Sequence, residues 1–176
     1  MTGRRPAPEL DPDADPAAVA RSIVLRQLTS SAKSRHQLAQ KLAERHVPAE
    51  VVEEVLDRFE AVGLVDDAEF AQMWVRSRAQ TRHLARGALG RELSEKGIDP
   101  DLAAEALEQL SDEDEHAAAA ALVRRKLRPG MDLGERAERE KHVRRLVGML
   151  ARKGYSPSLS FQIVNAEMDA WLDGAG

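Results

Sequence analysis

Two adjacent carboxylates, Asp66 and Asp67, have the spacing in this sequence that best fits acid–base or metal chemistry. Paired carboxylates do such work when burial and neighbouring charges shift their pKa values. Here they stand directly before a run predicted to be helical, where free backbone N–H groups and the helix dipole favour a carboxylate. Glu69, three residues after Asp66, completes the spacing of a capping box. The pattern therefore favours helix capping over a metal or catalytic role.

Two aromatic residues follow this pair, in a chain whose aromatic content is only 3%. Phe70 and Trp74 are one helical turn apart, and exposed rings at that spacing could form a stacking platform for nucleic-acid bases. The same spacing places both rings on the apolar face of a helix, where large aromatic side chains usually belong to the core. We therefore expect Phe70 and Trp74, like Asp66 and Asp67, to form a structural motif.

The basic residues gather in three groups that could bind DNA phosphates or an acidic protein surface. The first lies between Ala71 and Arg91, a stretch with five arginines and no acidic residue. The second, Arg124 to Arg128, stands at the end of a predicted helix, where cations also complement the helix dipole. The third lies between Lys141 and Ala166, again without an acidic residue.

For any single cation a solvated helix face is the simpler interpretation, but as uninterrupted groups these residues favour binding. The candidate partner-binding or DNA-binding residues are Arg76, Arg78, Arg82, Arg86, Arg91, Arg124, Arg125, Lys126, Arg144, Arg145, Arg152 and Lys153.

Other residue types that carry chemistry show no catalytic or metal-binding pattern. The five histidines are scattered, without the spacing of a helical zinc motif. The sequence contains no phosphate-binding loop, nucleophile elbow or dinucleotide fingerprint. Because it contains no cysteine, disulfides and thiolate metal sites are excluded. We therefore expect neither an enzyme nor a bound cofactor or metal.

The composition indicates a soluble, helix-rich protein of 176 residues, with 43% hydrophobic and 32% charged residues. No apolar run is long enough to cross a bilayer, and the N-terminus lacks a signal-peptide core. We expect a cytoplasmic protein without membrane contact. The net charge of −4 argues against a strongly basic nucleic-acid binder. Acidic and basic blocks alternate along the chain, however, so one face could still be basic.

The elements that must position these groups follow a pattern that occurs three times. The first copy consists of Leu38, Leu42, Val47, Pro48, Val51 and Leu56. The second copy consists of Leu89, Leu93, Ile98, Asp99, Leu102 and Leu107. The third copy consists of Leu146, Leu150, Tyr155, Ser156, Leu159 and Val164. Each copy predicts a middle helix, a short joint and a last helix, with a first helix before them.

This repetition predicts an all-α tandem array of three three-helix, helix-turn-helix-like repeats with an elongated shape, either straight or curved. No stretch alternates with a period of two, so we expect no sheet. The expected divisions are a disordered tail over 1–16 and repeats over 17–63, 64–111 and 112–173. The first helices are predicted over 17–29, 67–80 and 112–127, the middle helices over 35–45, 84–96 and 135–153, and the last over 49–62, 101–110 and 158–172.

The joints between middle and last helices have a common form. The second reads Lys96-Gly97-Ile98 and the third reads Lys153-Gly154-Tyr155, and glycine suits the left-handed backbone that ends many helices. In the first joint His46 stands where the other two have glycine.

With the joints, one further motif completes a recognisable pattern. It comprises Gly63-Leu64-Val65-Asp66-Asp67, Phe70-Ala71, Trp74-Val75 and Arg78. Over Arg21 to Trp171 the chain thereby resembles the RecX family, regulators of the RecA recombinase. The resemblance implies a non-enzymatic protein that lodges in the groove of the RecA–DNA filament. There it would lower ATP hydrolysis and strand exchange and favour loss of the filament.

The implied partners are the RecA filament and DNA, the latter bound weakly or within the filament, and the protein is expected to be a monomer. The alternative is a helix-turn-helix regulator that binds duplex DNA directly. The negative net charge and the lack of a clear dimerisation helix weigh against that alternative.

Overall fold

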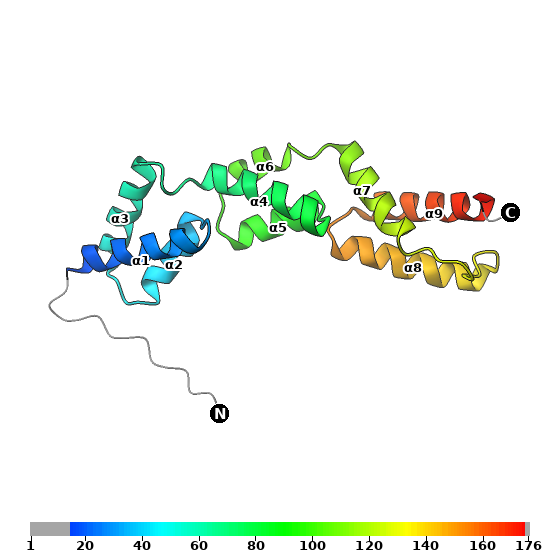
Figure 1. The fold of residues 1–176 in the computed structure, drawn as a ribbon, viewed down its shortest axis with the longest axis horizontal. Helices are drawn as coiled ribbons and strands as arrows, with labels where there is room; N and C mark the ends of the chain where they lie inside the picture. Colours follow the sequence, from blue (N-terminus) through cyan, green and yellow to red (C-terminus); the bar gives the residue numbers. More distant parts are fainter. Residues whose placement is uncertain (1–14, 175–176) are drawn as a thin grey trace, which may run out of the picture.

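The computed structural model describes residues 15–174, and every regular element within that range is an α-helix. The helices are α1 (Pro16–Ser30), α2 (Arg35–Ala43), α3 (Ala49–Ala61), α4 (Asp67–Arg82), α5 (Arg86–Glu95), α6 (Pro100–Leu107), α7 (Asp112–Arg124), α8 (Arg136–Arg152) and α9 (Pro157–Gly174). They lie in three groups of three, one after another along the long axis of the molecule (Figure 1). We call α1–α3 unit 1, α4–α6 unit 2 and α7–α9 unit 3.

Each unit is built around its own buried cluster, because the apolar faces of its three helices turn towards one another. The largest fully buried side chains of unit 1 are Leu38, Leu42 and Leu56. Those of unit 2 are Leu89 and Leu93, and those of unit 3 are Leu133, Leu146, Leu150, Ile163 and Met168. Helix packing is extensive within units and sparse between them. The all-α repeat array predicted from the sequence is confirmed.

Short polar side chains begin most of the helices by accepting the free N–H groups of the first turn. Asp15 caps α1, whose first residue is Pro16. Ser34 forms a reciprocal capping box with Gln37 at α2. Asp66 accepts the N–H of Glu69 at 2.9 Å to begin α4. In the part of the chain that the structure describes, the return bond from Glu69 that a capping box requires is not formed.

The helix ends differ slightly from the predicted ones, for local reasons. The middle helix of unit 2 begins at Arg86 rather than residue 84, because His83 is left-handed (φ 51°) and Ala85 is extended. The α7 helix ends at Arg124 rather than residue 127, and the chain then tightens into a turn that still buries Leu127. The expected tail falls largely on residues 1–14, which lie outside the described range.

All three joints place one residue in the left-handed region. The φ angles are 58° at His46, 69° at Gly97 and 90° at Gly154. The joints therefore share a backbone form, although only the second and third carry the glycine that suits it.

Candidate functional site

Neighbouring units are held together by the joint of one unit docking on the middle helix of the unit before it. Between units 1 and 2, the buried Ser34 hydroxyl donates to the Lys96 carbonyl at 2.6 Å. The Arg35 N–H donates to the Asp67 carboxylate at 2.8 Å. Asp67 therefore does not cap its own helix; it satisfies a free N–H of α2, across the boundary between units.

The same arrangement recurs between units 2 and 3. The Ala85 N–H donates to the Lys153 carbonyl at 2.9 Å, and the Arg86 N–H donates to Glu115 at 2.6 Å. Tyr155 then adds a hydroxyl that donates to the His83 carbonyl at 3.1 Å. The Lys153 ammonium donates to the Arg82 carbonyl at 2.7 Å. These bonds anchor the third joint against the end of α4 and the start of α5.

The glycines of the second and third joints are needed for this docking. A Cβ on Gly97 would overlap His36 of α2, and a Cβ on Gly154 would overlap the backbone of Ala88 on α5. His46 is exposed, and within residues 15–174 the first joint docks on no other unit. A side chain is therefore tolerated there.

A basic cleft of about 750 Å³ opens where the third joint meets unit 2. It collects members of all three basic groups of the sequence, and we call it the basic cleft. Its cationic lining residues are Arg82, Arg125, Lys126, Arg128, Arg152 and Lys153. Its remaining lining is Thr81, His83, Leu84, Leu122 and Met149.

The charge of the basic cleft is uncompensated. Its lining contains no acidic residue. Within residues 15–174, none of its six cations forms an ion pair. Only the Lys153 ammonium has a bonded partner in this range, the Arg82 carbonyl. Cations gathered without counter-charges repel one another, so an anionic partner would stabilise the arrangement. The cleft can thus hold a polyanion, such as the phosphates of a nucleic-acid strand.

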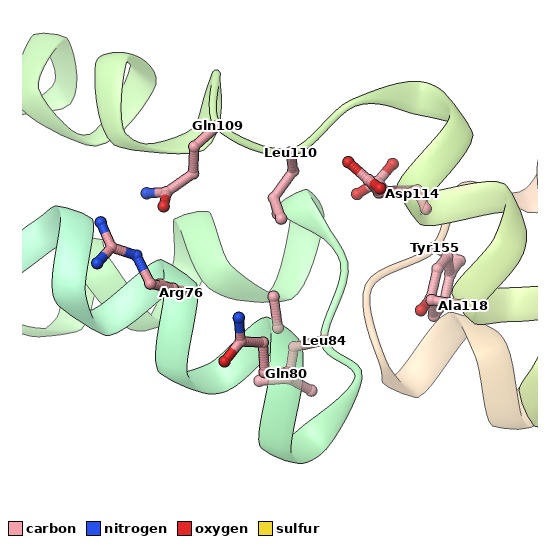
Figure 2. Close-up of a pocket in the computed structure, with 10 residues that line it drawn as sticks. Arg76, Gln80, Leu84, Gln109, Leu110, Asp114, Ala118 and Tyr155 are labelled. Atoms are coloured by element: carbon pink, nitrogen blue, oxygen red, sulfur yellow. The ribbon is translucent and has the colours of Figure 1, made fainter.

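A second cavity, of about 310 Å³, separates α4 and the end of α6 from α7 and Tyr155 (Figure 2). Arg76, Gln80 and Gln109 face it from unit 2, and Asp114 from unit 3. Leu84 lines both this cavity and the basic cleft. At the boundary between units 2 and 3, the basic cleft and the second cavity therefore lie on either side of Leu84.

Tyr155 lies at the wall of this second cavity and is nearly fully buried. Burial disfavours the charged phenolate, and the carboxylate of Glu115 adds to the effect, so the pKa of Tyr155 rises to about 12. The hydroxyl is thus protonated under ordinary conditions and able to donate to His83.

Three of the candidate arginines are committed to internal partners. Arg78 lies over the Trp74 ring and 3.6 Å from Glu92. The guanidinium of Arg86 donates to the Leu110 carbonyl and to Asp112. Arg124 forms a bidentate pair with Glu167, at 2.6 and 2.7 Å, which raises the pKa of the guanidinium. The structure gives each of them a role in holding helices together.

Trp74 is half-buried and enclosed by its neighbours. It stacks on the buried Phe70 with ring centroids 5.7 Å apart, and its Nε1–H donates to Glu92 at 2.8 Å. Arg78 lies 4.3 Å and Lys96 4.0 Å from its ring centroid. Burial is the main cause that lowers the pKa of the Lys96 ammonium, and Arg78 adds to it against the opposing effect of Glu92. The ring faces are occupied, which leaves no platform for a nucleic-acid base.

The remaining candidates lie apart from the basic cleft. Arg91 and Arg145 are exposed on α5 and α8. Arg76 lines the second cavity, and Arg144 lines a groove between α8 and α9. Sequence grouping therefore selected the cations of the cleft together with others that the fold disperses. It could not place Arg82 beside Arg152, because only the docking of the third joint brings them together.

The described residues contain no group of three or more His, Asp or Glu side chains placed to hold a metal ion. Over the same residues, no helix is both long and apolar enough to cross a membrane.

Three stacked three-helix units with a basic cleft at one boundary define a helical-repeat protein. Two family models match the chain: "RecX, first three-helix domain" over residues 20–59 and "RecX, second three-helix domain" over residues 66–107. With the relatives described next, these matches show that the chain belongs to the RecX family.

The chain is 48% identical over 159 residues to "Regulatory protein RecX" of Streptomyces coelicolor, covering 90% of this chain and 82% of the relative. It is 48% identical over 153 residues to the protein of the same name from Thermobifida fusca, covering 87% and 80% of the two chains. The crystal structure of RecX from Lactobacillus salivarius superposes with a TM-score of 0.73 at 21% identity. That match covers 89% of this chain and 98% of the other, and it supports the fold.

Proposed function

We propose that this protein is a non-enzymatic regulator of the RecA recombinase, which binds the RecA–DNA filament and lowers its ATPase and strand-exchange activity. The observation that carries the proposal is the basic cleft, in a chain of the RecX family. The cleft suits the phosphates of filament DNA, and the elongated array suits a partner that repeats along an axis. We further propose that the protein acts as a cytoplasmic monomer in homologous recombination, DNA repair and the SOS response.

The mechanism that follows is one of binding rather than chemistry. Phosphates entering the basic cleft would relieve the repulsion among its cations, and they would contact units 2 and 3 at once. Because the units touch each other sparsely, the array can adjust its curvature while each core stays intact. A bound array that spans successive subunits would hinder their turnover of ATP.

The test measures ATP hydrolysis by RecA on single-stranded DNA as this protein is added. We expect the wild type to inhibit. The double variant Arg125→Glu/Arg152→Glu should need at least about tenfold more protein for the same inhibition, because it reverses charge within the cleft.

The matched control is Arg26→Glu/Arg58→Glu, which changes net charge equally on exposed positions of unit 1. It should inhibit like the wild type. No inhibition by the wild type at stoichiometric amounts would contradict the proposal. Tight, sequence-selective binding to duplex DNA without RecA would favour the alternative, a helix-turn-helix regulator.

A further inference from the structure

In unit 1 the middle and last helices are bridged by charge. Arg35, at the start of α2, reaches across to three carboxylates of α3. Its guanidinium donates to Glu53 at 2.7 Å, Asp57 at 2.8 Å and Glu60 at 2.7 Å. Desolvation by burial acts to lower the pKa of Arg35. The hydrogen bonds to Glu53 and Asp57 and the charge of Glu60 have a larger combined effect, so the pKa is raised. The space between α2 and α3 is therefore bridged by the chain's own ion pairs.

In unit 2 the equivalent arginine serves the boundary with unit 3. Arg86 corresponds to Arg35 in the repeat pattern, and it turns to Asp112 and the Leu110 carbonyl. The positions of Glu53 and Asp57 are taken by Ala104 and Glu108. Here too the residue at the start of the middle helix has a partner within the chain.

In unit 3 the positions that correspond to Arg35, Glu53 and Asp57 are uncharged. Val143 replaces the arginine, and Phe161 and Asn165 replace the carboxylates. These three residues line an open groove of about 470 Å³ between α8 and α9, which we call the α8–α9 groove. Phe161 is 49% exposed, because the buried face of α9 runs through Ser160, Val164 and Met168 beside it. No described element covers the ring, and a large exposed aromatic in a groove is typical of a contact site.

The rim of the α8–α9 groove is nearly neutral, unlike the basic cleft. Arg139 is paired with Asp169 at 2.6 Å, and Arg136 with Glu140 at 3.1 Å. Arg144 is the one lining cation that lacks a carboxylate partner among residues 15–174. A strand of phosphates requires several free cations, whereas an apolar pocket with one free arginine fits an apolar side chain that has a carboxylate near it.

We propose that the α8–α9 groove is a protein-docking site that takes an apolar side chain from an acidic segment of a partner, with Arg144 binding the adjacent carboxylate. Phe161 and Val143 supply the apolar contact. Asn165 Nδ2 donates to the Phe161 carbonyl at 3.0 Å, so its Oδ1 is the atom that can accept an N–H of the segment. The inference goes beyond the proposed function, because it assigns a protein contact to a surface separate from the basic cleft.

The experiment follows amide shifts of the full chain by NMR during titration with three probes. The first is a short acidic peptide with one central phenylalanine, the second is the same peptide with alanine there, and the third is a single-stranded oligonucleotide. We expect the phenylalanine peptide to shift the resonances of Val143, Arg144 and Phe161. It should bind at least about tenfold more tightly than the alanine peptide.

Phe161→Ala should abolish those shifts, and Phe161→Leu should restore most of the binding, while helicity is unchanged because the ring is exposed. The oligonucleotide should shift residues of the basic cleft instead. Shifts in the α8–α9 groove with the oligonucleotide and not with the peptide would overturn the proposal in favour of nucleic acid. No shift there with any probe would also overturn it, whatever the result with RecA.

Discussion

Arg35 and Arg86 occupy the same position in successive units, and each donates its backbone N–H to a carboxylate of the unit that follows. The acceptors are Asp67 for Arg35 and Glu115 for Arg86, at 2.8 and 2.6 Å. Both donors are first-turn groups that have no partner within their own helix. One unit therefore completes the hydrogen bonding of the unit before it, which makes the order of the units part of the fold.

Asp67→Ala should weaken the contact between units 1 and 2. Loss of the charged acceptor leaves the Arg35 N–H unpaired, so its hydrogen exchange should accelerate roughly tenfold or more. The matched control is Asp66→Ala, which removes the cap of α4 at a cost of about 1 kcal/mol. The control should speed exchange at Glu69 and leave Arg35 unaffected. Equal exchange at Arg35 in both variants would show that the hydrogen bond to Asp67 does not protect this N–H.

Gly154→Ala should disrupt the boundary between units 2 and 3. The added Cβ would overlap Ala88, and the left-handed backbone also disfavours alanine, for a combined loss of roughly 2–5 kcal/mol. Gly63→Ala shares the left-handed backbone but meets open space, so it should cost only about 1 kcal/mol. Urea unfolding compares the two stabilities, and small-angle scattering reports whether the array loosens. Equal losses would show that docking does not require the glycine.

The ionisation of Tyr155 at alkaline pH can be measured directly from tyrosinate absorbance, because the sequence contains no other tyrosine. Its pKa is about 12 in the folded protein against 10.0 for the free side chain. A raised pKa means that the neutral hydroxyl stabilises the boundary fully below pH 10. That contribution is lost as pH rises from about 10 towards 12.

Tyrosinate absorbance should therefore titrate near pH 12 in the native protein and near pH 10 in urea. The variant Tyr155→Phe serves as the control and should show no tyrosinate signal. A native titration near pH 10 would mean that Tyr155 is neither buried nor bonded to His83.

The basic cleft should make DNA binding dependent on salt. Five cations of the cleft have side chains without a bonded partner among the described residues, whereas Lys153 donates to the Arg82 carbonyl. If each of these five contacts a phosphate of single-stranded DNA, log K should fall against log salt with a slope of about −3.5. Arg125→Gln should make the slope shallower by about 0.7, and Arg91→Gln, away from the cleft, should leave it unchanged. Fluorescence anisotropy at several salt concentrations measures both. An unaltered slope for Arg125→Gln would place the DNA elsewhere.

Much of the fold could be predicted because the repeat pattern is strong and local. Leu42, Leu93 and Leu150 recur at the same place, and each is fully buried in its own unit. The caps at Ser34 and Asp66 could also be predicted, since a cap depends on only a few adjacent residues. Boundaries such as the start of α5 were less accurate, because they depend on the backbone of single residues such as His83.

The candidate site could be predicted only as groups of cations. Arg86 and Arg124 belong to those groups, yet they bond Asp112 and Glu167, which lie 26 and 43 residues away in the chain. Pairing between residues so far apart in the chain leaves no local pattern in the sequence from which it could be predicted. The α8–α9 groove was missed for a different reason: its signal is the absence of charge at Phe161, where unit 1 has Glu53, and it becomes visible only when the repeats are compared.

The histidine distinguishes the first joint from the other two as a surface for contact between copies of the chain. The second and third joints each dock on the middle helix of the unit before. A first joint of the same form could dock on the middle helix of unit 3 in another copy, which would let copies polymerise head to tail. At the position of Gly97 and Gly154, a Cβ overlaps the helix on which the joint docks. His46 carries such a Cβ at the first joint, so it disfavours docking of that joint on the middle helix of another copy.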